Sequence, residues 1–247
     1  MSGGALAVVI VAVVIGSITK GVTGSGLPTV AIPVMAGFIG VEAAVVLMAF
    51  PTVVTNSWLL WEHRGHARNA RHLKRMLVAG AAGSVAGVWL LTTLPGNVLS
   101  LALAVVIFGY AALKLWRPEV ALPERAARLL SPPVGFAGGV AQGATGIAGP
   151  LTATYVHGFR LEPGAYVFTI AAQFQLFAAV QVATFVALGR YTGELVLGSL
   201  LSLIPVVLFL PVGIRLGRRL DRHRFERVVL VVLVVMGTKL LFDGLNG

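Results

Sequence analysis

The sequence lacks cysteine and is poor in charge, and both features narrow the class of protein. None of the 247 residues is cysteine, which excludes a disulfide-stabilised scaffold and any thiolate metal ligand. Charged residues make up 11% of the chain, against about 25% in ordinary soluble domains, and hydrophobic residues make up 57%. With a mean hydropathy of +0.91, the chain is not a soluble domain, a disordered segment or a nucleic-acid module, and we interpret it as a membrane protein.

Acidic residues are also scarce, and this limits the chemistry of the membrane interior. All nine Asp and Glu residues fall in predicted loops or at predicted helix ends, so no buried carboxylate relay is visible. A cation or proton antiporter and a membrane enzyme with an acid/base pair are therefore disfavoured. His63 and His66 have ligand-like spacing but no cysteine and only Glu62 beside them. The sequence predicts no catalytic residue, no metal site and no cofactor.

Ten apolar segments divide the chain, and six of them are about 18 residues or longer, enough to cross a bilayer as an α-helix. These six predicted transmembrane helices are 43–61, 77–94, 97–116, 164–188, 194–214 and 228–245. The other four segments form two pairs, and each member is too short to cross a hydrocarbon core of about 30 Å alone.

A glycine-rich break separates the members of each pair. The breaks are residues 21–26 in the pair 4–40 and residues 143–149 in the pair 133–159. Each pair predicts a re-entrant helix hairpin with its tip inside the membrane. Non-helical backbone at that depth is tolerated only where it is buried in protein or lines a water-filled cavity, so each tip implies a site.

Basic residues indicate the orientation. Placing loops 62–76, 114–132, 160–162 and 215–227 in the cytoplasm puts 16 of the 19 Lys and Arg residues there, in agreement with the positive-inside rule. This arrangement requires an even number of crossings from each hairpin, zero or two. Both termini are then predicted to be extracytoplasmic.

The breaks belong to an internal repeat. Gly21-x-Thr23-Gly24-x-x-x-Pro28 recurs as Gly143-x-Thr145-Gly146-x-x-x-Pro150, and Gly87-x-x-Leu90-x-x-x-Leu94 recurs as Gly213-x-x-Leu216-x-x-x-Leu220. Each half crosses the membrane three times, an odd number, so the second copy has the opposite orientation. Inverted repeats with broken helices are typical of secondary transporters. We therefore predict an all-α polytopic membrane protein with two inverted repeats, each a broken re-entrant helix hairpin plus three transmembrane helices. The first repeat covers 1–120 and the second 128–247.

The breaks suit an anion. A half-helix that starts at a glycine-rich tip directs free backbone N–H groups and the positive end of its dipole into the cavity, and hydroxyl side chains add donors. Lys20, the only basic residue predicted at membrane depth, directly precedes the first break, and Gln142 takes its place in the second. The predicted substrate-binding residues are Lys20, Thr23, Gly24, Ser25, Gly26, Asn56, Gln142, Thr145, Gly146, Ile147 and Gln173.

Each of these assignments has an alternative. The breaks could serve close helix packing, as we expect for Gly80, Gly83 and Gly87. Lys20 could extend to the interface or be deprotonated. Polar stripes follow the hairpins on helices 43–61 and 164–188, with Gln175 pointing elsewhere, and they could line a passage or only hydrogen-bond neighbouring helices.

The duplicated break followed by proline, and the Gly-x-x-Leu motif before each closing apolar helix, resemble the TauE/SafE family of sulfite and organosulfonate exporters over essentially the whole chain. The resemblance implies a bacterial or archaeal inner-membrane exporter of a small sulfur oxyanion such as sulfite, thiosulfate or an organosulfonate. An importer or exchanger of another anion on the same scaffold is the alternative, ahead of a membrane enzyme or a channel. The expected partners are this anion and the lipid bilayer, without nucleic acid. The oligomeric state, a homodimer included, stays open.

Overall fold

The structure, a computed structural model, describes residues 3–23, 26–70, 73–116, 122–217, 219 and 222–246. These residues are almost entirely helical, and no β-strand occurs among them. The helices are α1 (Gly3–Thr23), α2 (Leu27–Ile39), α3 (Val41–Glu62), the 3₁₀ helix η1 (Arg64–Asn69), α4 (Leu73–Thr93), α5 (Gly96–Trp116), α6 (Glu124–Thr145), α7 (Gly149–His157), α8 (Pro163–Ala187), α9 (Gly193–Leu201), α10 (Leu203–Gly217) and α11 (Arg222–Asn246).

The described residues contain seven helical stretches that are long and apolar enough to cross a membrane, one more than the sequence predicts. The additional stretch is α1, which has 21 residues because the helix continues through Lys20 as far as Thr23. The all-α polytopic class is confirmed.

The first arm of the second hairpin is longer than its apolar segment. We predicted ten residues at 133–142, but α6 has 22 residues and starts at Glu124. Its first turns carry Arg125 and Arg128, so a search for continuous apolar sequence misses them although they are helical. The predicted transmembrane segment 194–214 is one stretch, Gly193–Gly217, in which Ser202 alone separates α9 from α10.

Glycines bring the helices of the two halves into close contact. A Cβ atom added to Gly87 on α4 would lie 2.8 Å from the Cα atom of Gly143 on α6. One added to Gly213 on α10 would lie 3.0 Å from the Cα atom of Gly21 on α1. Gly80 and Gly83 likewise have no room for a side chain, so the predicted packing role of these glycines is confirmed. The pair α4 and α6 and the pair α1 and α10 each lie side by side, as do α5 and α11.

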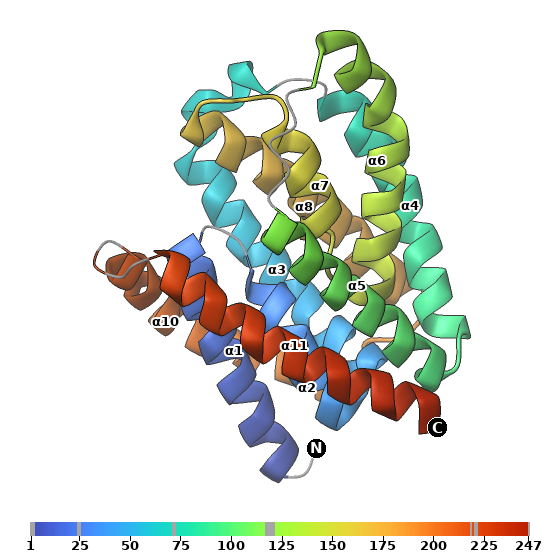
Figure 1. Cartoon of the computed structure of the whole chain (residues 1–247). Helices are drawn as coiled ribbons and strands as arrows, with labels where there is room; N and C mark the ends of the chain where they lie inside the picture. The colour runs from blue at the N-terminus through green and yellow to red at the C-terminus, as the bar shows by residue number, and fades with distance from the viewer. Residues whose placement is uncertain are drawn as a thin grey trace.

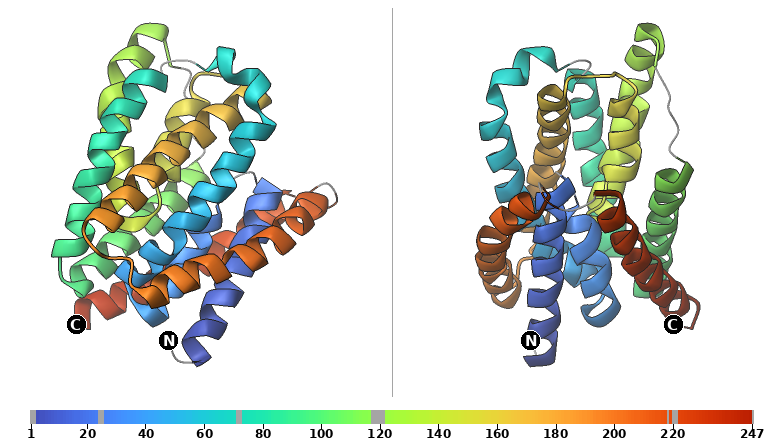
Figure 2. Two further views of the ribbon diagram at one scale, coloured as in Figure 1. Left: turned by 180° about the vertical axis from the view of Figure 1, so that it is seen from behind. Right: turned by 60° about the vertical axis from the view of Figure 1, so that its left-hand side comes forward.

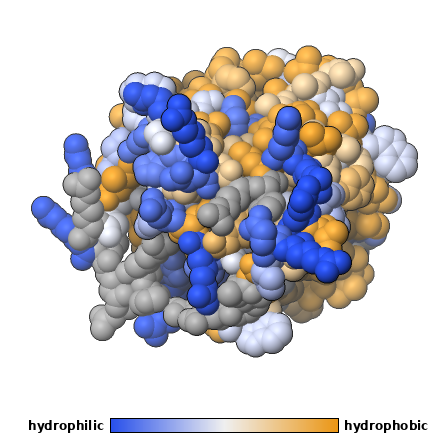
Figure 3. Space-filling model, turned by 90° about the horizontal axis from the view of Figure 1, so that it is seen from above, coloured by the Kyte–Doolittle hydropathy of each residue, from blue (hydrophilic) through white to orange (hydrophobic). Residues whose placement is uncertain are grey.

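The molecule has two different ends. Both termini lie at one end, and α1 starts there, whereas η1, the start of α6 and the loop between α7 and α8 lie at the other (Figure 1). The views in Figure 2 show the same arrangement. Hydrophilic side chains gather on the face seen in Figure 3, which is the end opposite the termini, and hydrophobic atoms lie beside them at the upper and right edges of the view. The hairpins α1–α2 and α6–α7 thus start from opposite ends.

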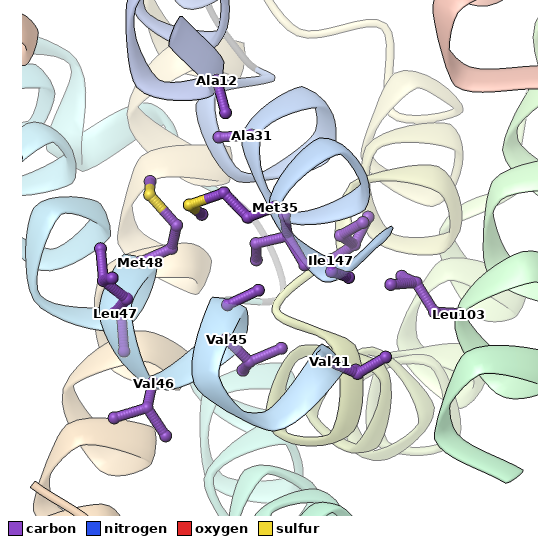
Figure 4. Close-up of a cluster of buried hydrophobic side chains, with 14 of the residues drawn as sticks. Ala12, Ala31, Met35, Val41, Val45, Val46, Leu47, Met48, Leu103 and Ile147 are labelled. Carbon is purple, nitrogen blue, oxygen red and sulfur yellow. The ribbon is translucent and has the colours of Figure 1, made fainter. Parts of the chain in front are cut away.

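A hydrophobic core fills the half of the molecule near the termini. It includes Met35 on α2, Val45 on α3, Leu103 on α5 and Ile147 beside the second break (Figure 4). All four tryptophans, by contrast, are exposed on the outer surface, near the ends of α3, α4 and α5. Tryptophan at helix ends is typical of the interface between membrane and water.

Candidate functional site

The first break interrupts the helix between Thr23 and Leu27. Gly26 has φ +116°, a left-handed conformation that favours glycine, and its carbonyl accepts a hydrogen bond from the N–H of Val30 (3.1 Å). Pro28 lies in the first turn of α2, where the absence of its N–H costs no helical hydrogen bond. The predicted site residues Gly24 and Ser25 lie outside the described residues.

Local hydrogen bonds stabilise the backbone of the second break. Gly146 has φ +70°, and its N–H donates to the carbonyl of Gln142 (2.7 Å). The Thr145 hydroxyl donates to the carbonyl of Ala141 (2.7 Å) and accepts from the N–H of Ile147 (3.3 Å). Thr145 therefore shapes the break rather than facing a cavity.

Both breaks line one cavity of about 580 Å³. The first contributes Lys20, Thr23 and Gly26, and the second contributes Gln142, Gly146 and Ile147. The first turns of α2 and α7 border the same space. Because a helix leaves its first N–H groups without intrahelical partners, both half-helices present donors and positive dipole ends to this cavity.

Lys20 is buried beside the cavity, with 4% of its surface exposed. Its ammonium group donates to Thr55 Oγ1 (2.8 Å) and to Asn56 Oδ1 (2.9 Å). Both acceptors are neutral, and no carboxylate forms an ion pair with Lys20 among the described residues. The alternative that Lys20 extends to the interface is therefore wrong. A charged Lys20 at this depth would have only hydrogen bonds and a bound anion to stabilise it.

Asn56 provides the next donor. Its Oδ1 accepts from Lys20, while its Nδ2 is buried and has no hydrogen-bond partner among the described residues. Asn56 also lines the cavity, together with Thr52 one turn earlier. An orphaned amide N–H next to an ammonium group suits a ligand that only accepts hydrogen bonds.

The second half contains a neutral counterpart of this pair. Gln142 Nε2 donates to Gln181 Oε1 (3.3 Å), and Gln181 Nε2 donates to the carbonyl of Gln142 (2.8 Å). The residue before each break thus binds an amide on the helix that follows the hairpin. Only the first pair contains a lysine, so the two breaks present different donors to the cavity.

Gln173 does not line the cavity. It is completely buried, and neither its Oε1 nor its Nε2 has a partner in the described part of the chain. The polar stripe on α8 faces protein. The residues of α8 that line the cavity include Tyr166, Ile170 and Phe174. Gln175 points elsewhere, as predicted, and donates to Ser57 Oγ (3.0 Å).

An ion pair that the sequence analysis did not identify also lines the cavity. Lys114 Nζ on α5 lies 3.0 Å from Glu226 Oε2 on α11, and both side chains are partly exposed. The two residues are 112 positions apart, so spacing gives no signal for their contact. In the sequence, this contact is indicated only by the positions of the two residues, one at the end of the first closing helix and one at the start of the second.

The described residues contain no group of three or more His, Cys, Asp and Glu that could hold a metal ion. The cavity lining has two lysines, Lys20 and Lys114, and one carboxylate, Glu226, besides its hydroxyl and amide donors. This balance favours binding of an anion over acid/base chemistry.

Comparison with known proteins gives one match. A family model described as "Sulfite exporter TauE/SafE" matches residues 8–240, nearly the whole chain. No curated protein and no solved structure matched.

Proposed function

The chain belongs to the TauE/SafE sulfite exporter family, a family of membrane transporters and not of enzymes, and on this premise we propose that it exports a small sulfur oxyanion from the cytoplasm. The substrate class is sulfite, thiosulfate or an organosulfonate. The observation that carries the proposal is the shared cavity, in which Lys20 and the free amide of Asn56 lie beside two half-helix N-termini.

The proposed binding mode uses these groups together. The oxyanion displaces no carboxylate, because the hydrogen-bond partners of Lys20 are neutral. Its oxygens accept from the ammonium of Lys20, from Asn56 Nδ2 and from the backbone of the tips. Gly26 borders the cavity without a side chain, so a ligand can approach its backbone closely.

The charge of the loops supports the orientation. The cavity lies at the C-terminal half of α3 and the N-terminal half of α8, toward the hydrophilic end that carries η1. We place this end in the cytoplasm of a bacterial or archaeal inner membrane, with both termini outside. With the cytoplasm negative, each negative charge that leaves gains about 2.3 kcal/mol per 100 mV, so export requires no coupling ion.

The packing supports the inverted repeat. Gly21 corresponds to Gly143 and Gly87 to Gly213 in the two motifs, and the contacts are Gly87 with Gly143 and Gly213 with Gly21. A two-fold axis in the membrane plane would produce this exchange. Alternating access then follows from rocking of the two halves around the shared cavity.

Flux through proteoliposomes tests the function. We expect the protein to carry radiolabelled sulfite, thiosulfate or sulfoacetate across the bilayer unchanged, faster when the compartment facing the basic end is negative. Lys20→Met should reduce this flux at least about tenfold, and Lys239→Met, which removes an exposed lysine paired with Asp243, should leave it unchanged. Flux of a different anion would support the alternative of an importer or exchanger, and normal flux in Lys20→Met would contradict the site.

A further inference from the structure

The second break is seated in the core of the opposite half. Ile147 is 2% exposed and belongs to the hydrophobic core formed mainly by α2, α3 and α5. Figure 4 shows Ile147 near Met35, Val45 and Leu103. Gly146 beside it is equally confined, because an added Cβ atom would collide with Cδ1 of Ile32 and lie 3.7 Å from Cγ1 of Val45.

Ile147 also lines the cavity, so it lies at the boundary between the cavity and the packed hydrophobic core. On α3 the core residues are at 41–49 and the cavity residues begin at Thr52. On α5 the core residues are at 99–107 and the cavity residues begin at Tyr110. The seated tip and this core therefore separate the cavity from the end that carries the termini.

The second half contributes its own helices to the cavity. Under the proposed repeat, α7, α8 and α11 correspond to α2, α3 and α5, and they line the cavity with Thr154, Phe174 and Val229. The positions that correspond to Gly146 and Ile147 are Gly24 and Ser25, which lie outside the described residues. The packed position of a tip is thus described for the second break.

We propose that Ile147 is the residue that seals the transport cavity toward the end carrying the termini, and that export requires Ile147 to leave its seat among α2, α3 and α5. Ile147 is then a positioning residue of the transporter, because its seat determines the side to which the cavity opens. The proposal rests on the proposed function, since a seal of this kind has a role only in a transporter.

The absence of native cysteine permits a direct test of this seal. Two single-cysteine reporters are placed in proteoliposomes of known sidedness: Val45→Cys, 1% exposed behind the tip, and Leu113→Cys, which lines the cavity. A membrane-impermeant maleimide is applied from the side of the termini for Val45→Cys and from the other side for Leu113→Cys. With the tip seated, Val45→Cys should react slowly and Leu113→Cys readily.

Gly146→Ala should unseat the tip, because Gly146 has a positive φ (+70°) and its new Cβ atom would meet Cδ1 of Ile32, whose side chain is 1% exposed and packed in the core. We expect labelling of Val45→Cys to rise at least about tenfold and labelling of Leu113→Cys to fall. Ile32→Val removes the colliding Cδ1 atom and should return both rates toward their starting values in the double variant. Gly189→Ala is the matched control, because Gly189 also has a positive φ (+64°) but no atom within 4 Å of an added Cβ.

Unchanged labelling of Val45→Cys in Gly146→Ala would overturn the proposal, and so would a rise at both reporters, which indicates a loosened fold. The labelling needs no substrate, so it separates the two proposals. Opposite changes at the two reporters without flux of any sulfur anion would refute the proposed substrate and leave the seal intact. Sulfur-anion flux with unchanged labelling would support the proposed substrate and refute the seal.

Discussion

At the scale of single residues, the site depends on a buried cation with neutral partners. Lys20 uses Thr55 and Asn56 as acceptors, and Asn56 Nδ2 is buried without a partner among the described residues, in a residue that lines the cavity. A buried charge without a counter-ion is unfavourable, and removal of that cost by an incoming anion provides binding energy where the ligand must sit.

Asn56→Asp tests this reasoning by supplying a permanent counter-ion. The new carboxylate would lie within hydrogen-bond distance of Lys20, stabilise it, and compete with the substrate. We expect anion flux to fall at least about tenfold while the thermal stability in detergent stays equal or rises. Asn69→Asp, at an exposed asparagine in η1, is the control and should change neither. Wild-type flux in Asn56→Asp would argue against an anion at this position.

At the scale of helices, glycines determine how closely the two halves approach. A Cβ atom at Gly143 would lie 2.8 Å from the Cα atom of Gly87 and 2.7 Å from the N atom of Val88, and its three nearest atoms all belong to the backbone of α4. Gly109 on α5 has no atom within 4 Å of an added Cβ. The chain therefore offers a matched pair of helical glycines, one confined and one open.

We predict that Gly143→Val destabilises the protein by about 1–3 kcal/mol or more, because α4 and α6 would have to separate. Gly109→Val should have an effect within about 0.5 kcal/mol. Unfolding in detergent, followed by circular dichroism, measures both. Equal stability of the two variants would show that the contact between α4 and α6 is not as close as the structure has it.

The closing helices α5 and α11 meet through the ion pair Lys114–Glu226 at the cavity. Glu226 competes with an entering anion for Lys114. We predict that Glu226→Gln lowers the KM for anion entry from the basic end by about two- to fivefold, because a partly exposed pair contributes up to about 1 kcal/mol. Asp243→Asn breaks the pair with Lys239 outside the cavity and should leave the KM unchanged. An increased KM in Glu226→Gln would contradict this role.

At the scale of the whole molecule, the sequence predicts the breaks because glycine and proline act locally. The duplicated motifs place Lys20 and Gln142 directly before the two interruptions, and the structure brings both to one cavity. The start of α6 is not predictable from hydropathy, because its first turns are polar. Gln173 shows a second limit, since periodicity identifies a common face but not the neighbour that it meets. The contact between Lys114 and Glu226 exists only through tertiary folding.

We predict that one anion binds per chain beside Lys20 before any transport occurs. Equilibrium binding of radiolabelled sulfite, thiosulfate and sulfoacetate to the purified protein in detergent measures this directly, with Lys20→Met and Lys239→Met examined in parallel. We expect at least one of the three anions to bind the wild type and Lys239→Met alike, and to bind Lys20→Met at least about tenfold more weakly. Equal affinity of Lys20→Met and the wild type would contradict the central claim.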